Sequence, residues 1–128
     1  MKIHHIAFWV RDLKKMRAFY EQFFAAKAGE LYHNPRKQFH SYFLTFGKGA
    51  QIELMHRPDI PDSTTSGTEQ IGITHLAISL GSRQAVDELT QTLRVEGYPI
   101  IGEPRVTGDG YYESVILDPE SNRIELTV

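Results

Sequence analysis

One sequence pattern occurs twice in this chain. Residues Ile3–Ala7 (IHHIA) return as Ile73–Ala77 (ITHLA), and Ile52–Leu54 (IEL) returns as Ile124–Leu126 (IEL). Each half of the chain therefore begins with a histidine and ends with a glutamate, both inside apolar, β-prone stretches. A repeat of this kind is typical of a chain that folds as two copies of one supersecondary unit, and it limits the folds open to this sequence.

Composition places the chain among ordinary soluble globular domains. Its 128 residues suffice to bury roughly two thirds of the unfolded surface, and no apolar run approaches the roughly 20 residues of a membrane span. Cysteine is absent, which excludes disulfides, thiolate metal ligands and a cysteine nucleophile. The net charge of −2, without a basic stripe, predicts no nucleic-acid partner. Met1–Ile3 leads into a strand pattern and not into a signal peptide, so we expect a cytoplasmic protein with no membrane partner.

The first half predicts a strand, a helix and a β-hairpin. A strand is expected over residues 4–10, and Asp12 is a typical N-cap for the helix that follows. The helix shows apolar residues at spacings of 3, 4 and 7: Met16, Phe19, Tyr20 and Phe23. Residues 39–46 and 50–56 predict two antiparallel strands, with a further short strand near residues 30–33.

The second half predicts the same order of elements. A strand is expected over residues 73–80, and Ser82 is a suitable N-cap for a helix that Gly97 ends. The apolar positions of this helix are Val86, Leu89 and Leu93. Residues 111–117 and 123–128 predict a closing hairpin.

The repeat also predicts how the chain divides. We expect a first module over residues 1–58 and a second over residues 71–128. Residues 59–70 between them are rich in proline, serine, threonine and glycine, which is typical of a linker.

Side-chain alternation places the repeated polar residues on one face of each predicted sheet. His5 lies opposite the apolar side chains of its strand, and Glu53, His75 and Glu125 lie opposite the apolar side chains of theirs. By the same alternation His4 is expected to point away from His5 and not to share its surroundings.

These four residues are candidate metal ligands. If the two faces converge, two carboxylates meet in a low-dielectric cup and repel each other unless a cation lies between them. Imidazole and carboxylate suit Ni, Co, Zn, Fe or Mn, and four ligands of an octahedron leave two positions open for water or substrate. The alternative is structural, with each histidine hydrogen-bonded in a core and each glutamate facing water.

Four segments carry a family resemblance: residues 3–7, Asp12-Leu13 with Phe19-Tyr20, residues 74–77, and residues 117–126. In these segments the chain resembles the vicinal oxygen chelate superfamily, which contains glyoxalase I, fosfomycin-resistance enzymes, extradiol dioxygenases, methylmalonyl-CoA epimerase and bleomycin-binding proteins. The resemblance implies an α+β fold of two tandem β-α-β-β-β modules that form an open cup-shaped sheet around a divalent metal.

The order His, Glu, His, Glu is similar to that of glyoxalase I. It implies that His5, Glu53, His75 and Glu125 hold Ni, Co, Zn or Mn and that the protein is a lyase acting on the hemithioacetal of a 2-oxoaldehyde, such as methylglyoxal, and a thiol. In that mechanism chelation stabilises an enediolate while a glutamate moves the proton. By analogy we favour Glu125 as this base over Glu53.

The resemblance also implies an assembly. Members this short commonly form homodimers, in which His5 and Glu53 of one chain join His75 and Glu125 of the other. Two modules that close on each other within one chain are the alternative.

Four further residues are candidate substrate contacts. Trp9 and Arg57 stand where glutathione-using bacterial glyoxalases often carry arginine and asparagine, so the identity of the thiol is left open. Tyr111 and Glu113 follow a glycine-rich segment and share one strand face, and Glu113 is an additional candidate base. Three histidines without repeat partners are expected in or beside loops at the surface: His33, His40 and His56.

Two alternative functions belong to other branches of the superfamily. One is metal-dependent opening of the fosfomycin epoxide, with Glu53 as base instead of ligand. The other is a non-enzymatic, bleomycin-like binding protein that uses Trp9 and the tyrosines as stacking surfaces. An extradiol dioxygenase fits less well, because a fourth protein ligand would occupy a position that catechol or oxygen needs.

Overall fold

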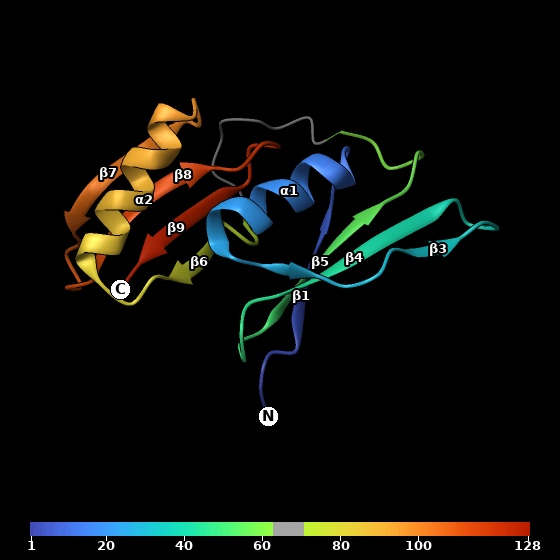
Figure 1. Cartoon of the computed structure of the whole chain (residues 1–128), viewed down its shortest axis with the longest axis horizontal. Helices are drawn as coiled ribbons and strands as arrows, with labels where there is room; N and C mark the ends of the chain where they lie inside the picture. The colour runs from blue at the N-terminus through green and yellow to red at the C-terminus, as the bar shows by residue number, and fades with distance from the viewer. Residues whose placement is uncertain (63–70) are drawn as a thin grey trace. The chain divides into compact units, whose positions relative to one another are not determined.

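The computed structural model describes residues 1–62 and 71–128 and has the expected α+β architecture. The chain divides into two compact units, Met1–Ser66 and Gly67–Val128 (Figure 1). Of the predicted linker, residues 59–62 belong to no helix or strand, and residues 63–70 lie outside the described residues.

The first unit contains one sheet and one helix within its described residues. Its elements are β1 (His5–Trp9), α1 (Leu13–Phe24), β2 (Lys27–Ala28), β3 (Tyr32–Asn34), β4 (Phe39–Thr45) and β5 (Gln51–His56). The strand order is β1-β5-β4-β2, with β3 also paired to β4. β1 runs parallel to β5, and the other pairs are antiparallel. The predicted strands are confirmed with small shifts at their ends.

The second unit repeats the plan. Its elements are β6 (Leu76–Ser79), α2 (Arg83–Val95), β7 (Ile100–Val106), β8 (Tyr112–Leu117) and β9 (Arg123–Thr127). The strand order is β6-β9-β8-β7, and β6 runs parallel to β9. β6 is shorter than the strand predicted over residues 73–80, while the closing hairpin is confirmed.

β7 has no counterpart among the strands predicted from the residue pattern. It contains Gly102 and Pro104, two residue types that are depleted in regular strands and mark edge strands and bulges. The pairing of β7 with β8 shifts register between Ile100 and Gly102, and again between Gly102 and Arg105. β7 is therefore an irregular edge strand, which a simple alternation of apolar residues does not reveal.

Both helices begin at the predicted caps, and α2 ends at the predicted glycine. The Asp12 carboxylate accepts a hydrogen bond from the Lys15 N–H at 2.9 Å, and the Ser82 hydroxyl accepts one from the Ala85 N–H at 3.1 Å. α2 ends just before Gly97, whose φ of 85° is a conformation that glycine adopts without strain.

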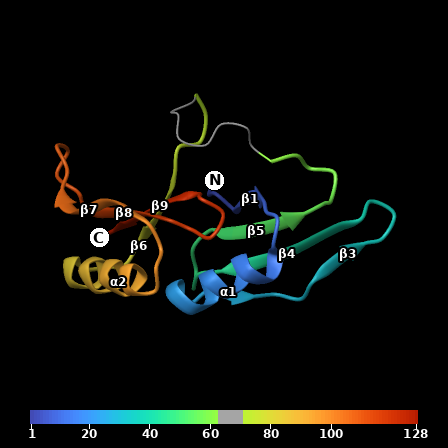
Figure 2. The ribbon, with the colours of Figure 1, turned by 90° about the horizontal axis from the view of Figure 1, so that it is seen from above.

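The core of each unit lies between its helix and one face of its sheet. Figure 2 shows each helix lying against one side of its own sheet. α1 buries Met16, Phe19 and Tyr20, and α2 buries Val86, Thr90 and Leu93. The facing strands contribute further buried apolar residues: Leu44, Ile52, Leu54, Ile116, Ile124 and Leu126. The other face of each sheet is left to the repeated His and Glu residues.

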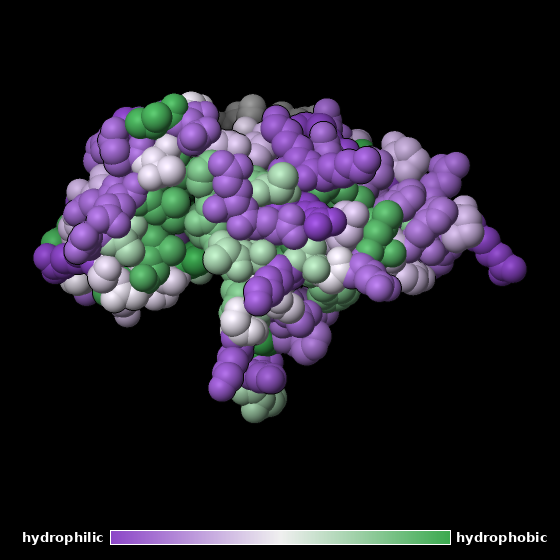
Figure 3. All heavy atoms as spheres, viewed as in Figure 1, coloured by the Kyte–Doolittle hydropathy of each residue, from purple (hydrophilic) through white to green (hydrophobic). Residues whose placement is uncertain are grey.

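One face of the molecule mixes polar and apolar side chains. Hydrophilic side chains cover most of the face drawn in Figure 3, with smaller apolar patches between them. Among the described residues, no helix is long and apolar enough to cross a membrane.

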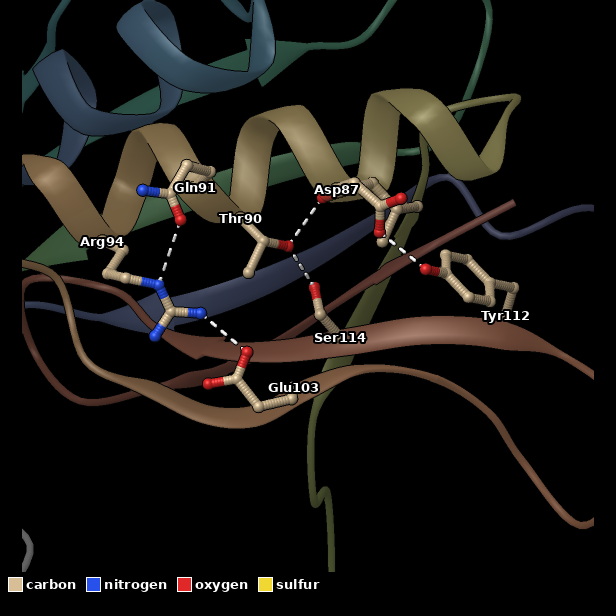
Figure 4. A network of polar contacts seen from close by, with 8 residues as sticks. Asp87, Thr90, Gln91, Arg94, Glu103, Tyr112 and Ser114 are labelled. Carbon is tan, nitrogen blue, oxygen red and sulfur yellow. Dashed lines mark hydrogen bonds and ion pairs between the residues drawn. The ribbon is translucent and has the colours of Figure 1, made fainter.

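A buried pair of hydroxyl groups joins α2 to β8. Thr90 Oγ1 donates to the Val86 carbonyl oxygen at 2.6 Å and lies 2.6 Å from Ser114 Oγ (Figure 4). Because Thr90 has a single hydroxyl proton, Ser114 must donate to Thr90. Both side chains are almost fully buried, so Thr90 is the acceptor on which the Ser114 hydroxyl depends.

The substitution Thr90→Val is expected to lower the free energy of unfolding by about 1–3 kcal/mol, because it leaves the buried Ser114 hydroxyl without its acceptor. The double variant Thr90→Val with Ser114→Ala removes both polar groups and should recover most of the loss. Thr92→Val removes the same kind of bond, to the Glu88 carbonyl oxygen, at an exposed position and should change little. Urea denaturation compares the parent with Thr90→Val, Ser114→Ala, the double variant and Thr92→Val. Losses of the two single variants that add in the double variant would contradict the pairing.

Candidate metal and substrate site

Each unit pairs its first strand with its last strand in the same register. In the first unit Ala7 pairs with Glu53, and in the second unit Ala77 pairs with Glu125. The repeated histidine stands two residues before the alanine in both units. Residues two apart along a strand share a face, so His5 lies on the face of Glu53, opposite the helix. His75 directly precedes β6, and its Nε2 lies 3.1 Å from Glu125 Oε2, so the second histidine also lies with its glutamate. The sequence repeat thus corresponds to a repeated pairing of the first and last strands in the two units.

The two His–Glu pairs also agree in distance and exposure. His5 Nε2 lies 3.8 Å from Glu53 Oε2, and His75 Nε2 lies 3.1 Å from Glu125 Oε2. The histidine side chains are 39% and 38% exposed, and the glutamate side chains are 15% and 19% exposed. Two ligands about 2.1 Å from one ion and at right angles to each other would be about 3 Å apart. The spacing of the second pair matches this value, and that of the first pair needs only a small side-chain movement.

Each glutamate has one apolar cross-strand neighbour. Glu53 on β5 pairs with Phe43 on the neighbouring strand β4. The Phe43 ring meets the His5 ring edge-on at a centroid distance of 5.4 Å. Glu125 pairs across β8 with Val115. An apolar floor limits the water available to a carboxylate and strengthens its attraction for a cation.

His4 does not point away from His5 as predicted. β1 begins only at His5, so regular alternation does not extend to His4. The two Nδ1 atoms lie 2.9 Å apart, within hydrogen-bond distance. This contact leaves His5 Nε2 directed at Glu53, and a hydrogen bond at one ring nitrogen is how a ligating histidine is commonly oriented.

The donor atoms fit a divalent ion, but each unit supplies only two of them. Among residues 1–62 and 71–128, no group of three or more His, Asp or Glu side chains is arranged to hold a metal ion. Imidazole nitrogen with carboxylate oxygen is a donor set that Ni, Co, Zn and Mn accept. Each unit by itself thus presents one histidine and one glutamate within 4 Å of each other.

Trp9 and Arg57 lie together in the first unit, with Trp9 on the His5 face of β1. Arg57 Cζ is 5.6 Å from the centroid of the Trp9 ring, within the range of a cation–π contact. Trp9 is 43% exposed and shares the His5 face of β1. The Arg57 guanidinium also hydrogen-bonds the Asp59 carboxylate, which lowers the pKa of Asp59 below its usual value. These residues form an aromatic and cationic surface suited to a ligand.

The structure separates the two candidates that follow the glycine-rich segment. Glu113 pairs with Thr127, two residues beyond Glu125, and so faces the same side of the sheet. Its side chain is 14% exposed, and its Oε1 lies 3.5 Å from Arg105 Nη2. Tyr111 precedes β8 and is 62% exposed. Glu113 is therefore the better placed of the two.

An open hollow of about 620 Å³ lies on this face of the second unit. Its lining includes His75 and Glu125, together with Val115, Arg105 and Arg123. The two arginines were not among the candidates predicted from the sequence. Arg123 could have been found, because it stands two residues before Glu125 on a predicted strand. Arg105 could not, because its strand was not predicted.

The three unrepeated histidines form a row across neighbouring strands. His33 pairs with His40 and His40 pairs with His56 across β3, β4 and β5. The rings of His33 and His40 stack at 4.3 Å, and His56 Nδ1 lies 2.9 Å from the Val10 carbonyl oxygen. The row lies on the helix side of the sheet, away from Glu53. The predicted loop position was wrong for His33 and His40, which lie within β3 and β4, whereas His56 ends β5 and His33 is exposed as expected.

A sequence profile establishes the family of the chain. The profile of the Glyoxalase/Bleomycin resistance protein/Dioxygenase superfamily matches residues 2–126. The chain belongs to this superfamily. The match includes both His–Glu pairs, and membership confirms the fold expected from the resemblance.

Relatives within the superfamily include bacterial and plant proteins. The uncharacterised protein YwkD of Bacillus subtilis is 31% identical over 125 residues, covering 97% of this chain and 94% of that protein. A lactoylglutathione lyase of Arabidopsis thaliana is 29% identical over 126 residues, covering 95% of this chain and 42% of the enzyme. The crystal structure of a glyoxalase I mutant from Zea mays has a TM-score of 0.80 at 25% identity, covering 98% of this chain and 44% of that one. The chain thus spans less than half the length of the two plant proteins.

Proposed function

We propose that the protein is a divalent-metal-dependent, glyoxalase I-like lyase that isomerises the hemithioacetal of a 2-oxoaldehyde, such as methylglyoxal, and a thiol. One observation carries the proposal: in each unit the repeated histidine lies within 4 Å of the repeated glutamate. Superfamily membership and the similarity to a lactoylglutathione lyase support it.

His5, Glu53, His75 and Glu125 are the residues that would hold the ion, which we propose to be Ni, Co, Zn or Mn. Their donor atoms and their spacing within each pair support this assignment. When bound, such an ion supplies Lewis-acid stabilisation of the negative charge that develops on two adjacent substrate oxygens.

The reaction also needs a base that moves a proton between neighbouring carbons. We assign this role first to Glu125, because its side chain is largely buried beside Val115 and borders the hollow. Glu53, equally enclosed in the first unit, is the second candidate. Glu113 is the third candidate. The Arg105 guanidinium lies 3.5 Å from its carboxylate, and a neighbouring cation makes a carboxylate a weaker base.

The remaining candidates would bind the thiol portion of the substrate. Trp9 offers an exposed ring for stacking, and Arg57 offers a cation for a carboxylate. Glu113 and the exposed Tyr111 would contact the substrate from the second unit, Tyr111 only at the margin of the site. The thiol itself is left open.

Metal analysis combined with an activity assay tests this function. The purified protein is analysed for bound elements, stripped, and titrated with Ni, Co, Zn and Mn while methylglyoxal is supplied with glutathione and with other thiols. Stoichiometric metal and metal-dependent turnover are the expected result. Stoichiometric metal without turnover would reject the glyoxalase assignment in favour of another metal-dependent branch, such as opening of the fosfomycin epoxide. No metal binding under any condition would favour a non-enzymatic binding protein.

A further inference from the structure

We propose that His33 and His40 form a second site for a divalent transition-metal ion, separate from the His–Glu pairs. His33 on β3 and His40 on β4 are register partners, and both side chains leave the helix side of the first sheet. His40 shares this side with the buried Leu44, whereas Glu53 leaves the opposite side. The site takes an ion that imidazole binds well, such as Cu²⁺, Ni²⁺ or Zn²⁺, and does not depend on the proposed function.

The strand pairing brings the two imidazoles within reach of one ion. Direct cross-strand partners have Cβ atoms about 4.5–5.5 Å apart, and the rings of His33 and His40 lie nearly parallel with their centroids 4.3 Å apart. An ion about 2.1 Å from each of two nitrogens holds those nitrogens about 3–3.4 Å apart. The stacked rings must therefore tilt toward each other to share an ion, and rotation about the side-chain bonds supplies this tilt while the strands stay paired.

The nitrogens of both rings are available to an ion. Within residues 1–62 and 71–128, neither ring enters a hydrogen bond or an ion pair. His56, the third histidine of the row, differs, because its Nδ1 donates to the Val10 carbonyl oxygen at 2.9 Å. A neutral imidazole has one nitrogen lone pair, so His33 and His40 together offer two lone pairs that no protein donor occupies.

The surroundings of the pair admit an ion and limit its identity. Figure 1 and Figure 2 both show β3 and the adjoining end of β4 extending past α1. His33 is exposed and His40 is half-buried, so water reaches both rings. Arg36 and Lys37 lie in the turn between the two strands, and their charge disfavours ions that are held by charge alone. The pair should therefore select Cu²⁺, Ni²⁺ or Zn²⁺ over Mg²⁺ or Ca²⁺, which prefer oxygen ligands.

A bound ion would tie β3 to the sheet. β3 has three residues and pairs with β4 off the main path of strands. An ion that binds the folded protein and not the unfolded chain adds to stability in proportion to the logarithm of its concentration. Because this site has two protein ligands, it should bind an ion more weakly than the proposed four-donor site does.

A zinc titration followed by NMR tests this site. The metal-free protein, labelled with ¹⁵N and ¹³C, is titrated with Zn²⁺, and the ring resonances of its six histidines are followed separately. We expect the His33 and His40 rings to shift along one binding curve, whose Kd rises at least about tenfold in His33→Gln and in His40→Gln. His56→Gln is the matched control, because it changes the same row without removing a proposed ligand, and it should leave this Kd unchanged. Mg²⁺ at the same concentration should not shift the two rings.

The same spectra separate this site from the proposed catalytic ion. His5 and His75 report the catalytic ion through their own resonances. Shifts at His33 and His40 that are lost in the two variants support the second site even if the glyoxalase assignment fails. An absence of shifts at these two rings in the parent protein, or an equal loss of affinity in His56→Gln, would overturn it.

Discussion

Replacing Glu125 by glutamine is expected to raise the Kd for Ni²⁺ or Zn²⁺ at least about a hundredfold, because the loss of a residue that merely supports a ligand already costs 10–100-fold. Glutamine keeps the size of the side chain and removes the charge that pairs with the cation. The same variant should lose metal-dependent turnover, since Glu125 is both a proposed ligand and the preferred base. Calorimetric titration of the stripped protein measures the first effect.

The pair in the first unit provides an independent test of the same site. His5→Ala should weaken metal binding as much as Glu125→Gln, although the two residues belong to different units. Glu88→Gln makes the same chemical change on α2, where Gln84 Nε2 donates to Glu88 at 2.8 Å, and should bind metal like the parent. Thermal unfolding establishes that the variants are folded. If His5→Ala and Glu125→Gln both bind metal normally, the ligand assignment is wrong.

The face of each functional side chain could be predicted because strands have a fixed period of two. Ile52 and Leu54 enclose Glu53 in sequence and are buried, while Glu53 lies on the other face, and the same holds around Glu125. The helix caps could be predicted because Asp12 and Ser82 act on groups only three residues away. Local chemistry thus accounts for the elements and for the direction of each candidate ligand.

Contacts that depend on strand register could not be predicted in this way. Arg105 meets Glu113 only because β7 shifts register twice, and a shift of one residue moves a side chain to the other face. His33 meets His40 across a strand of three residues, which is too short to show alternation. The His4–His5 contact depends on where β1 begins. In each case the deciding interaction is with another strand or lies at the end of one.

A mixture of two inactive variants should regain activity if the metal is shared between two chains. In the homodimer that the family resemblance implies, His5 and Glu53 of one chain join His75 and Glu125 of the other. A dimer of one His5→Ala chain and one His75→Ala chain then has one site with both changes and one intact site. Random pairing should restore about a quarter of the parent activity, because half of the dimers are mixed and each has one intact site of two. Co-refolding of differently tagged chains, followed by the methylglyoxal assay, measures the recovery.

The repeat itself supplies the matched control for this experiment. Mixing His5→Ala with Glu53→Gln damages the same half of the site in both chains, so no combination of chains is intact and activity should not return. Recovery in the first mixture and not in the second would place the site between chains. If neither mixture recovers while each parent chain is active after the same refolding, the two His–Glu pairs of one chain must meet each other, and the shared arrangement is wrong. Ala7 pairs with Glu53, and Ala77 pairs with Glu125 in the same way, so each unit presents one His–Glu pair. Two such pairs are compatible with a site between chains and with a site within one chain.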